Sequence, residues 1–541
     1  MQWFRPLVLA SLCSAAAIDP ALAFNPFESI GKAMQDAVQQ SQQPPAQQRQ
    51  LAPQRQSAPQ RQSAPSAVPG GDLGIAMAGQ RQVVYEGYSK TMLPIKALLN
   101  KGLAEDAYSA KLANDKRDNL SGMLADLEQA TLALDAARLD DAKAGFHQAE
   151  NKLNARDERS TVGGFFSGTK DMLLSTLTGN AELGEYEGAG FERVLMLNYK
   201  SIAHLLDGER SAYNVTRRAI DLQNIEKQKF DELVREAKAK LEEEQQAQKS
   251  KGKDVESYAL DDVVEQQYRA GDRQALKVPH AFVNPFGFYV AGMVQELDSY
   301  EDKSLRDNAR ISYKKALELN PKSAVIKGAV RDLGKPAPAN RRLVNVIIGD
   351  GFAPEKQLLK FDLRLGASLP TEIELPLYQP VRSRVHRVEV QTTSGKRWAQ
   401  ASEVADISAL ALRYQKDSGP IHQLRMMTTV IRNIVEGQAL NRAQQQAGVF
   451  GSVFGALKEQ RDEMAHPDMR SWTTLPSRLL AARFFVPANV AVVNIVSYDA
   501  KGRKLASQTV ALDKQSHNLV YARTLDNTIY SAANKKLWVG L

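Results

Sequence analysis

The segment Pro336-Ala-Pro-Ala-Asn340 separates two parts of the chain that have different hydrophobic periods. Before it, over residues 80–335, apolar side chains recur at the spacing of amphipathic helices. After it, over residues 341–541, apolar and polar residues alternate or form short β-branched runs, which is typical of strands. The sequence therefore predicts an α+β fold, with an N-terminal helical module followed by a strand-rich module.

The helical module contains a repeat pattern, which is clearest just before the break. Ala309, Tyr313, Ala316 and Pro321 have the small–aromatic–small spacing and the final proline of a tetratricopeptide (TPR) unit, and Tyr300 is expected at the aromatic position of its first helix. Two weaker copies are centred on Ala142, Phe146 and Ala149 and on Ala212 and Ala219. Because the copies are irregularly spaced, the pattern predicts a degenerate TPR-like solenoid with insertions. A long charged helix is expected over residues 226–253.

The C-terminal part is predicted to combine a sheet with an inserted helical segment. The expected strands are residues 343–348, 357–365, 385–392, 479–485, 490–498, 504–512 and 518–523. The helical insertion is expected over about residues 403–464.

Residues 1–23 have the features of a secretory signal peptide. Arg5 precedes an apolar run that is too short to span a bilayer, and Ala21 and Ala23 favour cleavage before Phe24. The single cysteine, Cys13, lies inside this segment. The mature chain would then contain no thiol, which excludes disulfides, thiolate metal sites and cysteine nucleophiles.

Two features are expected between the signal and the helical module. Residues 24–40 are predicted to form one amphipathic helix, with Phe27, Ile30 and Met34 on its apolar face. Residues 41–79 are rich in glutamine and proline and predict a disordered tether. Helix and tether together suggest an anchor to a membrane surface or a partner, and an unstructured remnant after cleavage is the alternative.

The composition gives no sign of catalysis. The seven histidines have no metal-binding spacing, and no phosphate loop or nucleophile elbow occurs in the sequence. We therefore predict no catalytic residue, metal or cofactor. The formal net charge of +8 is compatible with anionic glycans, lipid headgroups or acidic proteins, or with an ordinary charged surface. A nucleic-acid partner is not expected for an exported chain.

Three phrases, in this order, resemble a family of largely uncharacterised bacterial envelope proteins with TPR-like repeats. They are Phe282-Val-Asn-Pro-Phe-Gly-Phe-Tyr289, Gly351-Phe-Ala-Pro-Glu-Lys356 and Asp468-Met-Arg-Ser-Trp-Thr-Thr-Leu-Pro476, the last of which precedes an expected strand that carries Arg483. The resemblance covers roughly residues 184–520. It implies a periplasmic accessory protein associated with the outer membrane. Most members of the family look like lipoproteins, whereas here Leu12 precedes Cys13 and no usable lipid-attachment motif is present.

Two segments are candidates for binding a partner. Phe450, Gly451, Phe454 and Gly455 form an apolar stretch whose small residues lie four apart, a spacing that lets helices approach closely. Arg470 and Trp472 combine two residue types that often anchor interfaces. Burial in the core is the alternative for both segments.

The repeats and the signal peptide predict an exported, non-catalytic scaffold in the periplasm. The resemblance implies that it serves a multi-component cell-envelope assembly for cell-wall synthesis, secretion or surface attachment. Its expected partners are other envelope proteins, with the outer-membrane surface or peptidoglycan as further candidates. A glycan-binding or glycan-active protein is one alternative. An oligomeric structural subunit of an envelope ring is the other.

Overall fold

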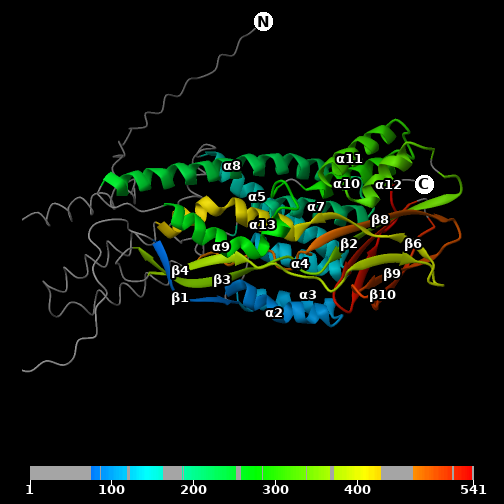
Figure 1. The fold of residues 1–541 in the computed structure, drawn as a ribbon. Helices are drawn as coiled ribbons and strands as arrows, with labels where there is room; N and C mark the ends of the chain where they lie inside the picture. Colours follow the sequence, from blue (N-terminus) through cyan, green and yellow to red (C-terminus); the bar gives the residue numbers. More distant parts are fainter. Residues whose placement is uncertain are drawn as a thin grey trace, which may run out of the picture. The chain divides into compact units, whose positions relative to one another are not determined.

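The protein has an α+β fold, in which helices predominate before Leu333 and strands after it (Figure 1). The computed structural model describes residues 75–118 without 86, 122–162, 186–250 without 187, 257–336 without 283, 338–365, 371–427, 467–514 and 517–538. The predicted signal peptide, the predicted helix with Phe27, Ile30 and Met34, and the apolar stretch with Phe450, Gly451, Phe454 and Gly455 lie outside these residues.

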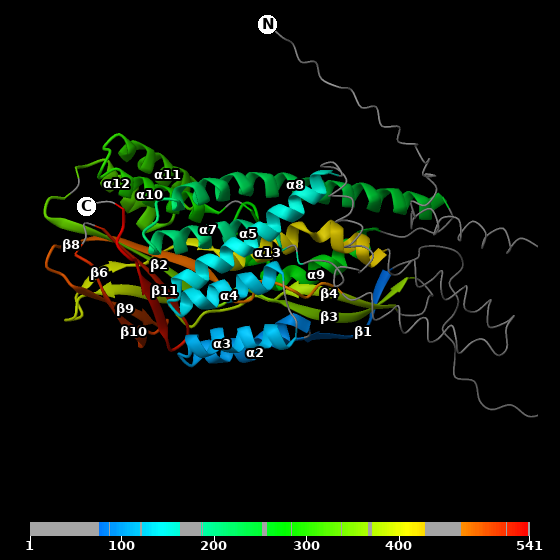
Figure 2. The same cartoon turned by 180° about the vertical axis from the view of Figure 1, so that it is seen from behind.

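Most helices pack against their neighbours in sequence. The successive packed pairs are formed by α2 (Gly87–Asn100), α3 (Ala104–Arg117), α4 (Met123–Asp135), α5 (Leu139–Val162), α7 (Gly190–Leu206), α8 (Ala212–Ser250), α10 (Pro285–Asp298), α11 (Leu305–Leu319) and α12 (Ala324–Leu333). Helix α9 (Ser257–Ala275) instead packs on α13 (Ile407–Asp417). In Figures 1 and 2, α8 and α10–α12 lie at the top of the view and α2 and α3 at the bottom.

Small residues allow close contact within two of these hairpins. A Cβ atom added to Gly145 of α5 would lie 2.9 Å from the Cβ of Ala130 of α4. A Cβ atom added to Gly292 of α10 would lie 2.9 Å from the ring of Tyr313 of α11. Ala309, Tyr313 and Ala316 are fully buried on the inner face of α11. These positions therefore set the distance between paired helices.

Tyr300 does not lie on the first helix of its hairpin, so that part of the repeat prediction is wrong. Helix α10 ends at Asp298, and Tyr300 lies in the following turn, where its N–H donates to the carbonyl of Leu297. Its side chain is 38% exposed, and its ring centroid lies 3.9 Å from that of His517. The aromatic residue of α10 that meets Tyr313 is Tyr289, at 5.4 Å between ring centroids.

The central element of the C-terminal part is a five-stranded sheet in the order β12-β11-β2-β8-β7. Its strands are β2 (Arg341–Asp350), β7 (Ser402–Asp406), β8 (Arg478–Pro487), β11 (His517–Thr524) and β12 (Ile529–Ala533). Strand β11 is parallel to β2, and the other neighbours in this sheet are antiparallel. Strands β2, β8 and β11 correspond to predicted strands.

Both faces of this sheet are buried, because successive side chains of a strand point to opposite sides. Val344, Val346 and Ile348 of β2 pack in a core with residues of a second sheet. Ile347 of β2 and Tyr521 of β11 pack against the helices instead. This double burial explains the nearly continuous apolar sequences of β2 and β11.

Two smaller antiparallel sheets complete the strand-rich part. One has the order β10-β9-β5-β6, formed by β5 (Arg387–Gln391), β6 (Arg397–Gln400), β9 (Val492–Tyr498) and β10 (Lys504–Ala511). The other has the order β1-β3-β4, formed by β1 (Ile75–Val84), β3 (Lys356–Leu365) and β4 (Thr371–Tyr378). Strands β3, β5, β9 and β10 match predicted strands.

Three local predictions differ from the structure. Residues 75–84 form strand β1, although the sequence was expected to be tether up to 79 and helical from 80, because pairing with β3 supplies the backbone partners. Residues 402–406 form strand β7, so the helical part of the predicted insertion begins only at Ile407. The charged helix expected from residue 226 is the continuation of α8, which starts at Ala212.

The helices and the five-stranded sheet share one hydrophobic core. Trp472 is 1% exposed, and its ring lies 6.2 Å from that of Phe146 on α5 and 5.8 Å from that of Tyr199 on α7, measured between centroids. Tyr199 also meets Tyr521 of β11 at 6.4 Å. Almost every residue of α7 is buried. The two parts that the sequence separates at residues 336–340 therefore pack as one body around α7.

Because His517 is buried, the free energy of unfolding is expected to depend on pH. Burial, with Arg483 nearby, lowers the pKa of His517 to about 4. In the unfolded state the histidine has a pKa of about 6.5, so below this pH the unfolded state binds more protons than the folded state. The free energy of unfolding therefore decreases as the pH falls from about 6.5 to about 4. When the pH is lowered from ~7.5 to ~5, the free energy of unfolding of His517→Gln should decrease by about 2 kcal/mol less than that of the wild type.

Urea unfolding at the two pH values measures this difference. The variant His386→Gln is the control, because His386 lies on the surface. It should keep the pH dependence of the wild type. Equal losses in wild type and His517→Gln would contradict the prediction.

Candidate functional site

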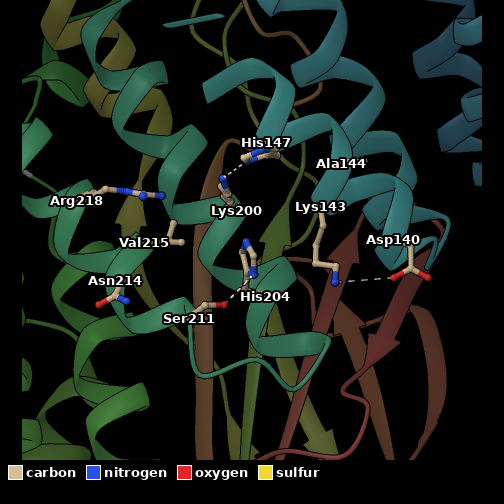
Figure 3. Close-up of a pocket in the computed structure, with 10 residues that line it drawn as sticks. All are labelled: Asp140, Lys143, Ala144, His147, Lys200, His204, Ser211, Asn214, Val215 and Arg218. Atoms are coloured by element: carbon tan, nitrogen blue, oxygen red, sulfur yellow. Dashed lines mark hydrogen bonds and ion pairs between the residues drawn. The ribbon is translucent and has the colours of Figure 1, made fainter. Parts of the chain in front are cut away.

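The clearest concave site in the described part of the chain lies where α5, α7 and α8 meet. It is an open pocket with a volume of about 610 Å³. Figure 3 shows the lining residues of α7 between those of α5 and those from α8 and the turn before it. The lining consists of Asp140, Lys143, Ala144, His147, Lys200, His204, Ser211, Asn214, Val215 and Arg218.

Helical spacing brings these side chains together. The four lining residues from α5 are separated by three, four and seven positions, which places them on one face of a helix. The same spacing recurs from Ser211, just before α8, to Arg218. Lys200 and His204 lie one turn apart on α7. Side chains from three helices, mostly polar, therefore line one pocket.

Lys200 is the buried polar group of this pocket, with a side chain that is only 5% exposed. Its ammonium group donates to Glu150 Oε2 at 2.5 Å and to His147 Nδ1 at 3.0 Å. Because Nδ1 accepts this hydrogen bond, the neutral ring of His147 carries its proton on Nε2. His147 is exposed and can therefore donate from Nε2 to a ligand.

Lys143 is held at one end of the pocket by two carboxylates of the α7–α8 turn. Its ammonium group bonds to Asp207 and, at 2.7 Å, to Glu209. Despite partial burial, these carboxylates raise the pKa of Lys143. Burial alone would raise the pKa of Asp207. Hydrogen bonds from Lys143 and Lys535 outweigh this effect and lower its pKa to about 2. Both groups are therefore charged at neutral pH.

His204 and Ser211 lie beside each other but do not form a catalytic pair. The carboxylate of Glu209 lies 2.5 Å from His204 Nδ1, and Ser211 Oγ lies 3.2 Å from the same nitrogen. A serine-hydrolase triad needs the acid on one ring nitrogen and the hydroxyl on the other. Burial also lowers the pKa of His204. Ser211 is therefore a polar lining group without an activating base.

The α8 side of the pocket presents unused hydrogen-bond donors. Arg218 is 53% exposed, and its Nη2 group lies 2.8 Å from Glu150 Oε1. Among the described residues, its Nε and Nη1 groups have no partner. The amide of Asn214, one turn earlier, is exposed on the same side.

The residues predicted from the sequence to bind a partner do not line this pocket. Trp472 lies on the core side of α5 and α7, where its indole N–H donates to Thr131 Oγ1 at 3.0 Å and its backbone N–H to Glu192. Arg470 is partly buried and forms an ion pair with Asp468 at 2.9 Å. The repeat-framework residues, from Ala309 to Pro321, lie on or after α11.

The pocket residues themselves were missed by the sequence analysis. A usable signal was present: Lys143 and His147 on α5 repeat the spacing of Lys200 and His204 on α7. Residues four apart lie on the same face of a helix, so each pair predicts a polar stripe. Recognition of a pocket required the additional knowledge that these two helices pack side by side.

The described part of the chain contains neither a metal-binding cluster nor a membrane-spanning helix. No group of three or more histidine, cysteine or acidic side chains there is arranged to hold a metal ion. Over the same residues, no helix combines the length and apolar character needed to cross a bilayer.

Comparisons with known proteins give no match at any of three levels. No protein-family model matches the chain, and neither a curated protein nor a solved structure is significantly similar to it. The function must therefore be inferred from the site and the fold.

Proposed function

We propose that the protein is a non-catalytic scaffold of the bacterial cell envelope, exported to the periplasm, which binds other envelope proteins on its helical surface. The observation that carries this proposal is the pocket at the junction of α5, α7 and α8, which is rich in hydrogen-bond donors. It offers fixed charges and polar groups for recognition. Its one serine–histidine contact lacks the geometry for nucleophilic attack.

The succession of helical hairpins supports this interpretation. α4 with α5, α7 with α8 and α10 with α11 are consecutive packed pairs, and each pair also contacts the next along the chain. We interpret them as degenerate TPR-like units, because two of them pair a small residue with an aromatic or small residue on the facing helix. Stacked helical repeats commonly bind protein segments along one face.

Site-specific photo-crosslinking in the native envelope tests the proposal. A photo-reactive phenylalanine derivative at position 214 places the probe on the exposed α8 side of the pocket. The same derivative at position 501 is the matched control, because Lys501 is exposed in the turn between β9 and β10. Mass spectrometry then identifies the crosslinked products.

A defined set of envelope proteins crosslinked from position 214, but not from position 501, is the expected result. Crosslinks to glycan fragments alone would instead favour a glycan-binding protein. Crosslinks only between copies of this chain would favour a ring subunit. Either of these outcomes, or identical products from both positions, would overturn the scaffold proposal.

A further inference from the structure

We infer that the pocket between α5, α7 and α8 binds an acidic, extended segment of a partner protein, through carboxylate side chains. This inference rests on the proposed scaffold function and adds the chemistry of the partner. It follows from the kinds of polar group that line the pocket, from their spacing and from the charge of the rest of the chain.

Hydrogen-bond donors outnumber acceptors on the pocket lining. Lys143, Lys200 and Arg218 are cations, and His147 donates from Nε2 because its Nδ1 is occupied by Lys200. The only carboxylate on the lining is Asp140, whose side chain is 81% exposed. A ligand that offers several acceptor oxygens would satisfy this lining, and charge-assisted hydrogen bonds to carboxylates are strong.

The nearby carboxylates do not replace a ligand, because the oxygens of Glu150, Asp207 and Glu209 are already bonded to lysine, arginine or histidine side chains of the protein. Glu150 is buried beneath Lys200 and Arg218, and Asp207 and Glu209 bond to Lys143 from the α7–α8 turn. These bonds hold the ammonium and guanidinium groups in fixed positions. A site whose donors are already ordered loses less conformational entropy when it binds.

The spacing of the donors suits an extended peptide. The lining rows on α5 and α8 each extend over seven residues, which corresponds to about 10 Å along a helix axis. In an extended chain, side chains two residues apart are separated by roughly 6.5–7 Å and lie on the same side. Two acidic side chains of one extended segment therefore fit within the length of one such row.

Two other occupants fit the pocket less well. The lining contains no phenylalanine, tyrosine or tryptophan ring on which a sugar could stack. The chain's own segment over residues 41–70 contains Arg49, Arg55 and Arg61 and no acidic residue, so its charge has the wrong sign. An acidic segment of another protein is the occupant that the lining favours.

Peptide binding to the purified full-length chain tests this inference. The probe is a short peptide that alternates serine and glutamate, and its counterpart replaces each glutamate with glutamine. An oligogalacturonate of similar length and inorganic phosphate serve as separate arms. Isothermal titration calorimetry at two salt concentrations should show binding of the glutamate peptide that weakens with salt, and no binding of the glutamine peptide.

Neighbouring arginines on α8 provide a matched pair of variants. Arg218→Glu reverses a charge on the pocket and should weaken binding of the glutamate peptide at least about tenfold. Arg217→Glu makes the same charge change one residue away, at an exposed position outside the lining, and should change the affinity by less than about threefold. Arg218→Gln removes the charge without introducing repulsion from Glu150 and should give an intermediate loss.

Thermal unfolding checks that all three variants are folded. If Arg217→Glu and Arg218→Glu weaken binding of the glutamate peptide equally, the peptide is held by diffuse charge attraction rather than by the pocket. That result would overturn the inference. Equal binding of both peptides, or binding of only oligogalacturonate or phosphate, would also overturn it. If the peptide fails but position 214 still crosslinks to defined envelope proteins, the scaffold function stands and only the acidic-segment inference falls.

Discussion

Replacement of Glu128 with alanine is expected to lower the free energy of unfolding by about 3–5 kcal/mol. Glu128 is fully buried on α4 and accepts four hydrogen bonds, from the backbone N–H and the hydroxyl of both Thr473 and Thr474. Without the carboxylate, two buried backbone N–H groups lose their acceptor and a small cavity forms. Urea unfolding followed by circular dichroism measures the change.

The matched control is Glu318→Ala, at an exposed position on α11. It should change the stability by no more than about 0.5 kcal/mol. Glu128→Gln is also expected to destabilise the protein, because the amide NH2 group would face the N–H and O–H donors of Thr473 or Thr474. A loss below about 1 kcal/mol for Glu128→Ala would show that this contact does not fix the segment to the helices.

Glu128 is important because it holds an irregular segment inside the molecule. The segment from Asp468 to Pro476 leads into strand β8 and has no regular secondary structure. Its polar backbone groups must therefore find partners elsewhere. Glu128 and Glu192, from two different helices, accept hydrogen bonds from its backbone. The helical part and the sheet are thus joined by polar as well as apolar contacts.

The elements that the sequence predicts well are those with a strong local pattern. Strands β2, β8, β9, β10 and β11 have long apolar or alternating runs, and α4 and α7 have clear helical periodicity. Strands β1, β4, β6, β7 and β12 were missed. β1 and β7 are each paired with a strand far away in sequence, so their backbone partners are not visible locally.

The pocket and the shared core could not be predicted for a related reason. The sequence places Tyr199 and Lys200 on adjacent positions of a helix, but only packing decides that Tyr199 meets Trp472 while Lys200 meets Glu150. Likewise, the alternatives for Trp472 were an interface and the core, and the structure places it in the core. Local patterns give the faces of an element, whereas tertiary contacts decide what each face covers.

The variant Arg483→Met is expected to lower the free energy of unfolding by about 3–5 kcal/mol. Arg483 lies on β8, on the face toward the helices, and its guanidinium group forms a two-point contact with Glu296 of α10, at 3.0 Å and 2.5 Å. Both side chains are only 2% exposed. Removal of the arginine would leave the buried carboxylate of Glu296 with Tyr313 as its remaining partner. Urea unfolding at neutral pH measures the loss.

The double variant Arg483→Met with Glu296→Leu separates a buried charge from a general packing defect. Buried ion pairs replaced on both sides by apolar residues often cost little, so the double variant should recover much of the stability lost in Arg483→Met. Arg503→Met is the surface control, because the Arg503 side chain, which pairs with Asp499, is 71% exposed, and it should cost no more than about 1 kcal/mol. If the double variant is less stable than Arg483→Met, then the ion pair is more stabilising than apolar packing at this junction. The contact between β8 and α10 would then depend on charge recognition rather than on the hydrophobic core around it.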